Sequence, residues 1–177
     1  MTQVAIPENV SVKIQDNVIF VEGPLGKVSR KFDPRTIAFK IEKNSVDLSA
    51  PMRRKTSRTP SKVMVGTMTS HIRNMIAGVT KGWEYRLKII YLHFPITVKV
   101  EGSKILINNF VGERSPRVTA LIGGAKIEVK GDEITVKGID LEEVSKTAAN
   151  IENVTKIKNY DRRVFQDGIY ITKGKKG

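Results

Sequence analysis

Basic side chains gather in two stretches of the sequence, and their chemistry suits phosphate binding. The stretch from Leu48 to Trp83 contains seven basic residues and no acidic one, and the stretch from Lys156 to Gly177 contains seven basic and two acidic residues. Together they account for +12 of the net charge of +13. Guanidinium and ammonium groups form charge-assisted hydrogen bonds with phosphate oxygens. This focused charge indicates a polyanionic partner, either nucleic acid or an anionic membrane surface, and its plain alternative is solubility alone.

Three groups of cations are the candidate contacts. The first lies in and just after a polar loop, residues 50–61, which has no apolar periodicity and is expected to become ordered on binding. The second is interleaved with Tyr160 and Phe165, an arrangement that permits base stacking, although core packing is the alternative and is favoured for Phe165. The third flanks Ser115-Pro116. The cations of these groups are Arg53, Arg54, Lys55, Arg58, Lys62, Arg114, Arg117, Arg162 and Arg163.

The sequence does not indicate a catalytic or metal site. His71 and His93 are far apart, lie in apolar neighbourhoods and have no carboxylate at ligand spacing, so we expect structural roles for both. There is no cysteine. Walker, G-x-G-x-x-G and G-x-S-x-G patterns are also missing. We therefore expect no metal, no cofactor and no small-molecule substrate. The missing motifs do not exclude an enzyme, but no residue is assigned as a nucleophile, base or oxyanion donor.

Composition favours a globular protein of the cytoplasm. Hydrophobic residues make up 40% of the chain and charged residues 28%. No apolar run approaches the roughly 20 residues that a membrane-spanning helix needs. The N-terminal residues lack the basic region and apolar core of a signal peptide.

A repeat at an offset of 86 residues divides the chain into two similar halves, since residues 96–107 repeat the apolar pattern of residues 10–21. A period near half the chain length indicates a tandem duplication of one domain. We predict domains at 1–81 and 82–177. A strand at 83–92 would either close the sheet of the first repeat or bridge the two repeats.

Each half is predicted to be an antiparallel sheet with one amphipathic helix packed on one face, an α+β fold. The first helix is expected to follow Thr59-Pro60, an N-cap and a proline at the first helical position. Asp140 is expected to cap the second helix, with Glu143 completing a capping box. Alternating apolar residues predict strands at 10–14, 18–22, 28–32, 39–41, 46–48, 83–91, 96–101, 104–108, 118–121, 127–129, 134–136 and 169–171.

Four segments carry a resemblance to a known family. They are Gly78–Lys88 (GVTKGWEYRLK), His93–Val100 (HFPITVKV), Asn108–Arg114 (NNFVGER) and Arg162–Ile171 (RRVFQDGIYI). In these segments the chain resembles the large-subunit ribosomal protein six family, in its archaeal and eukaryotic branch, whose eukaryotic member is numbered nine. The resemblance extends over essentially the whole chain.

This resemblance implies a structural, non-catalytic component of the large subunit, bound to large-subunit ribosomal RNA in the cytoplasm. It also implies a position near the sarcin–ricin loop and the stalk base, beside the elongation-factor site. Neighbouring ribosomal proteins and translation factors would then lie close by. The second half and the tail would make the main RNA contacts, through Arg114, Arg117, Lys156, Lys158, Arg162, Arg163, Lys173, Lys175 and Lys176.

Two other functions stay open from the residues alone. An extra-ribosomal RNA-binding or RNA-chaperone module would bind many RNAs with little preference. An enzyme acting on RNA or on a phosphorylated substrate would show a pocket with convergent polar groups.

Overall fold

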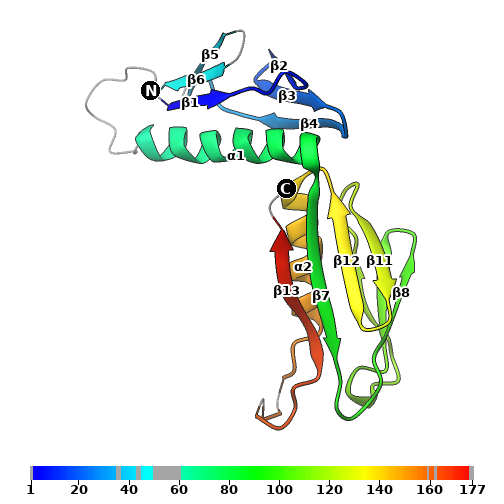
Figure 1. The fold of residues 1–177 in the computed structure, drawn as a ribbon. Helices are drawn as coiled ribbons and strands as arrows, with labels where there is room; N and C mark the ends of the chain where they lie inside the picture. Colours follow the sequence, from blue (N-terminus) through cyan, green and yellow to red (C-terminus); the bar gives the residue numbers. More distant parts are fainter. Residues whose placement is uncertain are drawn as a thin grey trace. The chain divides into compact units, whose positions relative to one another are not determined.

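The structure, a computed structural model, describes residues 2–34, 37–42, 45–49, 61–158, 160–161 and 163–175. The chain forms two compact units, Met1–Gly82 and Trp83–Gly177. Each unit combines antiparallel sheets with one long helix (Figure 1). The predicted α+β class, with its repeated sheet-and-helix plan, is confirmed.

The first unit contains two three-stranded sheets and the helix α1, Ser61–Lys81. Helix α1 contacts strands of both sheets, because its apolar residues recur every three or four positions and form one stripe. Ile72 on α1 and Ile19 and Leu48 on the strands are at most 1% exposed, so the core lies between helix and sheets. In sheet order, the strands are β2 (Ser11–Gln15), β3 (Val18–Gly23) and β4 (Gly26–Lys31), and then β1 (Thr2–Ala5), β6 (Ser45–Ser49) and β5 (Ala38–Glu42).

The second unit contains a three-stranded and a four-stranded sheet, the short 3-10 helix η1 (Phe110–Gly112) and the helix α2 (Leu141–Val154). Helix α2 contacts both sheets, and Leu87, Ile134 and Ile151 are fully buried in the core. In sheet order, the strands are β10 (Arg117–Ala120), β9 (Lys104–Asn108) and β8 (Thr97–Glu101), and then β11 (Lys126–Lys130), β12 (Glu133–Gly138), β7 (Trp83–Ile90) and β13 (Gly168–Lys175).

The two units repeat one topology in the register read from the sequence. Strand β8 occupies the residues that lie 86 positions after β2. Each unit has a meander of three consecutive strands and a hairpin, β5–β6 or β11–β12, beside one further strand. Strand β1 had not been predicted, because four residues with a single buried valine, Val4, are too short for a clear alternation.

The expected place of the strand around Trp83 was wrong. Strand β7 neither closes the first sheet nor bridges the repeats: it pairs antiparallel with β12 on one side and β13 on the other. Figure 1 shows it between these two strands, alongside α2. Burial explains the position, since Trp83, Leu87 and Ile89 are at most 4% exposed and need cover from their own unit. Strand β7 is thus the counterpart of β1, and β13 has none among the described residues of the first unit.

The start of α2 is held by two carboxylates with separate partners. Asp140 is the N-cap as predicted, and its Oδ1 accepts the Glu142 N–H at 2.8 Å. Glu143 does not complete the predicted capping box. Its Oε2 instead accepts the N–H of Gly124 at 2.9 Å, and this bond ties the helix to the turn after β10. The corresponding cap expected for α1, Thr59-Pro60, lies outside the described residues.

The carboxylate of Asp167 joins the loop after β7 to the start of β13. Its side chain is 1% exposed. Its Oδ1 accepts the backbone N–H groups of Leu92 (2.7 Å) and His93 (3.2 Å), and its Oδ2 lies 2.9 Å from His93 Nδ1. Burial by itself raises the pKa of this carboxyl, but the bonds from His93 and Leu92 stabilise the charged form and hold the pKa below its ordinary value.

We expect Gly123→Ala to destabilise the second unit more than Gly131→Ala does. Both glycines have positive φ, +62° and +56°, so each alanine costs about 1–2 kcal/mol in backbone strain. A Cβ at Gly123 would also collide with the Glu143 carboxylate, whereas nothing lies within 4 Å of one at Gly131. Displacing Glu143 breaks its bond to Gly124, which adds about 1–3 kcal/mol.

Urea unfolding followed by tryptophan fluorescence measures this difference, because the chain's one tryptophan, Trp83, is buried in the second unit. In a Glu143→Ala background, Gly123→Ala and Gly131→Ala should lower the free energy of unfolding by the same amount, because the side chain that a Cβ at Gly123 displaces is then missing. Equal losses for the two glycine variants in the wild-type background would contradict the steric argument.

Acid unfolding of the second unit should depend on Asp167. Because its folded pKa lies below the unfolded value of about 3.8, its stabilising contribution is complete above that pH and is lost as the pH falls through the folded pKa. Asp167→Asn should therefore lower the free energy of unfolding at neutral pH by about 1–3 kcal/mol and flatten its decline below pH 3.8.

The control for this substitution is Asp132→Asn, which changes an exposed carboxylate in the β11–β12 turn of the same unit. Fluorescence-monitored urea titrations between pH 2 and pH 7 give the comparison. If the free energy of unfolding of Asp167→Asn falls with decreasing pH as steeply as that of the wild type, Asp167 does not cause the acid sensitivity.

Candidate nucleic-acid interface

The predicted cations fall into those the structure describes and those it does not. Arg53, Arg54, Lys55, Arg58, Arg162 and Lys176 lie outside the described residues. Lys62 belongs to α1 and Lys175 to β13, but only their backbone positions are described. The remaining predicted cations are Arg114, Arg117, Lys156, Lys158, Arg163 and Lys173.

Arg117, at the start of β10, forms hydrogen bonds and a ring contact within the protein through its whole guanidinium group. Its Nε and Nη2 donate to the Glu113 carboxylate at 2.8 and 2.5 Å, and its Nη1 donates to the Val154 carbonyl at 2.6 Å. Its Cζ also lies 4.1 Å from the centroid of the Phe110 ring. The bond from Arg117 holds the pKa of Glu113 below its ordinary value. Arg117 therefore joins η1, β10 and the end of α2, and its contact with RNA stays a prediction.

The other five cations are exposed, and none forms an ion pair with a carboxylate in the described part of the chain. Lys173 stands apart from the rest, on β13 opposite Arg86 of β7. The remaining four belong to segments that the fold brings to one end of the second unit: Arg114, Lys156, Lys158 and Arg163.

We call this end the tip and define it as the described residues of 91–96, 109–116 and 156–167. Asp167 ties the first and third segments together, as described above. The first and second segments meet where Asn109 Nδ2 donates to the Pro95 carbonyl at 3.1 Å and where the Phe94 ring lies against Gly112. In Figure 1 the loop after β7 and the chain before β13 lie at the same end of the second unit.

The tip also exposes apolar side chains. Leu92 is 66% exposed, because β7 ends at Ile90 and Leu92 lies beyond the end of that strand. The exposed fractions run from 42% to 66% for Tyr91, Leu92, Phe94, Tyr160 and Val164. An exposed apolar group of this kind, bordered by unpaired cations, is typical of a binding surface.

His93 has the structural role expected for it, but through a partner that was missed. The sequence showed no carboxylate near it, because Asp167 is 74 residues away along the chain. The His93 ring also stacks on Phe165, with centroids 4.6 Å apart and an angle of 23° between the rings. Phe165 is half-buried and is not one of the core residues, so the core packing favoured for it is not what the structure shows: its ring contacts those of His93 and Tyr160. No group of three His, Asp or Glu side chains among the described residues is placed to hold a metal ion.

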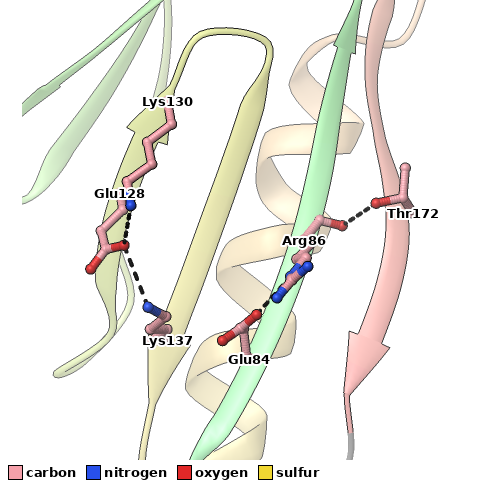
Figure 2. A network of polar contacts seen from close by, with 6 residues as sticks. All are labelled: Glu84, Arg86, Glu128, Lys130, Lys137 and Thr172. Carbon is pink, nitrogen blue, oxygen red and sulfur yellow. Dashed lines mark hydrogen bonds and ion pairs between the residues drawn. The ribbon is translucent and has the colours of Figure 1, made fainter.

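The outer face of the four-stranded sheet differs from the tip, because three of its cations are paired with acidic residues. Figure 2 shows Glu128 between Lys137 and Lys130, at 3.4 and 3.9 Å. On β7, Arg86 Nε donates to Glu84 at 2.7 Å, and this bond raises the pKa of Arg86. Three cations of this sheet face are therefore paired with carboxylates, whereas Lys173 of the same sheet has no such partner among the described residues. Within the described residues, neither helix is long and apolar enough to cross a membrane.

Comparison with known proteins agrees with the two repeats. The family model described as Ribosomal protein L6 matches residues 6–82 and 94–168. The large ribosomal subunit protein uL6 of Methanobrevibacter smithii is 48% identical, over 96% of this chain and 93% of its own length. The proteins of the same name from Aeropyrum pernix and Staphylothermus marinus are 47% and 49% identical, each over 96% of this chain and 91% of their own length.

These matches confirm the resemblance predicted from the four segments, including its archaeal branch. They cover both units, and they extend through the segments that build the tip. Nearly half of the aligned residues are identical in the archaeal relatives. The chain therefore belongs to the ribosomal protein L6 family.

Proposed function

We propose that this protein is a structural component of the large ribosomal subunit and that its tip binds large-subunit ribosomal RNA. Its relatives are named as large-subunit proteins, which supports the first part. The second part rests on the tip, where Arg114, Lys156, Lys158 and Arg163 are exposed without carboxylate partners among the described residues. Four unpaired cations on a fixed scaffold suit the phosphates of one folded RNA.

The scaffold makes this surface suitable for recognising an RNA shape. Asp167 and Arg117 hold its three segments through buried or bidentate contacts, so their cations have a defined arrangement before RNA binds. A defined arrangement lowers the ordering cost of binding. Contacts of this kind position a protein on the RNA backbone and read its shape rather than its base sequence.

The finer placement follows from the family resemblance. We propose that the tip lies near the sarcin–ricin loop and the stalk base, beside the elongation-factor site. Neighbouring ribosomal proteins and translation factors would then be close to it in the cytoplasmic ribosome. The basic loop with Arg53, Arg54, Lys55 and Arg58, and Lys62 after it, would contribute further RNA contacts, as would Arg162, Lys175 and Lys176.

The test compares two variants of the full chain that carry the same net charge. The tip variant replaces Arg114, Lys156, Lys158 and Arg163 by glutamine. The control variant also replaces four cations by glutamine: Arg86, Lys130, Lys137 and Lys146. These are exposed cations of the same unit that are paired with Glu84, Glu128 and Glu142. Binding to large-subunit ribosomal RNA and to an unrelated structured RNA is measured across a salt series.

We expect the wild-type chain to prefer ribosomal RNA. The tip variant should flatten the log–log salt slope by about 3, on the order of 0.7–0.9 per phosphate contact, while the control variant changes it by less than about 1. Equal binding of the wild type to both RNAs would indicate an RNA chaperone. An equal loss in both variants would mean that net charge, and not the tip, carries the binding.

A further inference from the structure

We propose that the exposed ring of Tyr160 is a stacking site for one unpaired base of the bound RNA. The inference rests on the proposed function and specifies how the tip works: its cations hold phosphates, and Tyr160 holds a base between them.

Three aromatic rings lie in series at the tip. His93 and Phe165 are stacked, and the centroid of Phe165 lies 4.7 Å from that of Tyr160 with an angle of 49° between their planes. The series is anchored at its inner end, because the buried carboxylate of Asp167 contacts both the ring and the backbone N–H of His93. Tyr160, at the outer end, is supported by Phe165 and is 53% exposed.

The backbone after Tyr160 turns back in a way that brings Phe165 to it. The carbonyl of Asp161 accepts the N–H groups of Val164 at 3.1 Å and Phe165 at 2.9 Å. The Asp161 carboxylate accepts the N–H of Arg163 at 2.9 Å. The donors and acceptors of these bonds all belong to the chain itself, so the turn supports the ring independently of a base, which limits the entropy lost on stacking.

The surroundings of Tyr160 favour RNA over a protein partner. Lys156, Lys158 and Arg163 are exposed close to it in sequence and have no carboxylate partner in the described part of the chain. Lysines are depleted from the cores of protein–protein interfaces, whereas single-stranded RNA sites combine a cationic track with aromatic rings on which bases stack. The base must be unpaired, because a base inside a double helix has both faces covered by its neighbours.

Substitution of Tyr160 in the full chain tests the stacking site. Tyr160→Leu keeps an apolar side chain but removes the ring, and it should weaken binding to large-subunit ribosomal RNA roughly five- to one-hundred-fold. The salt slope should not change, because no phosphate contact is lost. Tyr160→Phe keeps the ring and should bind within about twofold of the wild type.

Phe20→Leu is the control. Phe20 is a 38% exposed aromatic ring on β3, outside both the tip and the ring series, so its removal should leave the affinity within about twofold of the wild type. Ultraviolet irradiation of the wild-type complex, followed by mass spectrometry, should find a nucleotide cross-linked to Tyr160. Urea unfolding followed by circular dichroism checks that both leucine variants are folded.

The outcomes separate this inference from the proposed function. If Tyr160→Leu binds as tightly as the wild type while the tip variant loses affinity, the stacking site is refuted and the proposed function stands. The exposed ring would then be a contact site for a neighbouring protein. If Phe20→Leu and Tyr160→Leu lose the same affinity, a specific stacking ring is refuted. If neither Tyr160→Leu nor the tip variant loses affinity, the proposed RNA contact at the tip fails as well.

Discussion

The burial of one charged carboxylate, that of Asp167, governs how the end of the second unit is built. An ionised group that is 1% exposed is costly unless donors surround it. Here the donors come from Leu92 and His93, in the loop after β7. Loop and strand must therefore stay together for the carboxylate to remain charged. Phe165 is only two residues before Asp167, so the same constraint fixes the aromatic ring on which Tyr160 rests.

The second unit shows why the partners of a basic residue matter more than net charge. On the outer face of its large sheet, Arg86, Lys130 and Lys137 are exposed but paired with Glu84 and Glu128 (Figure 2). At the tip the exposed cations have no such partners among the described residues. A paired cation offers an incoming phosphate less net attraction, because the neighbouring carboxylate repels that phosphate. The tip is therefore the stronger candidate for a polyanion site.

The strands and helix that the two units share come from the duplication, whereas the tip depends on strand β13, which the second unit has in addition. Both units contain the three-strand meander, the hairpin and the helix, and β1 corresponds to β7. The second unit then adds β13 on the free edge of β7. The chain that leads into β13 contributes the third segment of the tip, with Tyr160, Arg163 and Asp167. The first unit has no counterpart of this strand among its described residues.

The sequence by itself determined the features that depend on near neighbours: the alternation of strands, the stripe of α1, the Asp140 cap, the duplicated register and the two basic stretches. The place of β7 and the partners of Arg117, Glu143 and Asp167 were decided by the tertiary structure. Apart from Glu113, which is four residues from Arg117, those partners lie 19 to 75 residues away along the chain. Local periodicity reports which face of an element is buried, but a hydrogen bond depends on which distant atoms the packed core brings within 3 Å of each other.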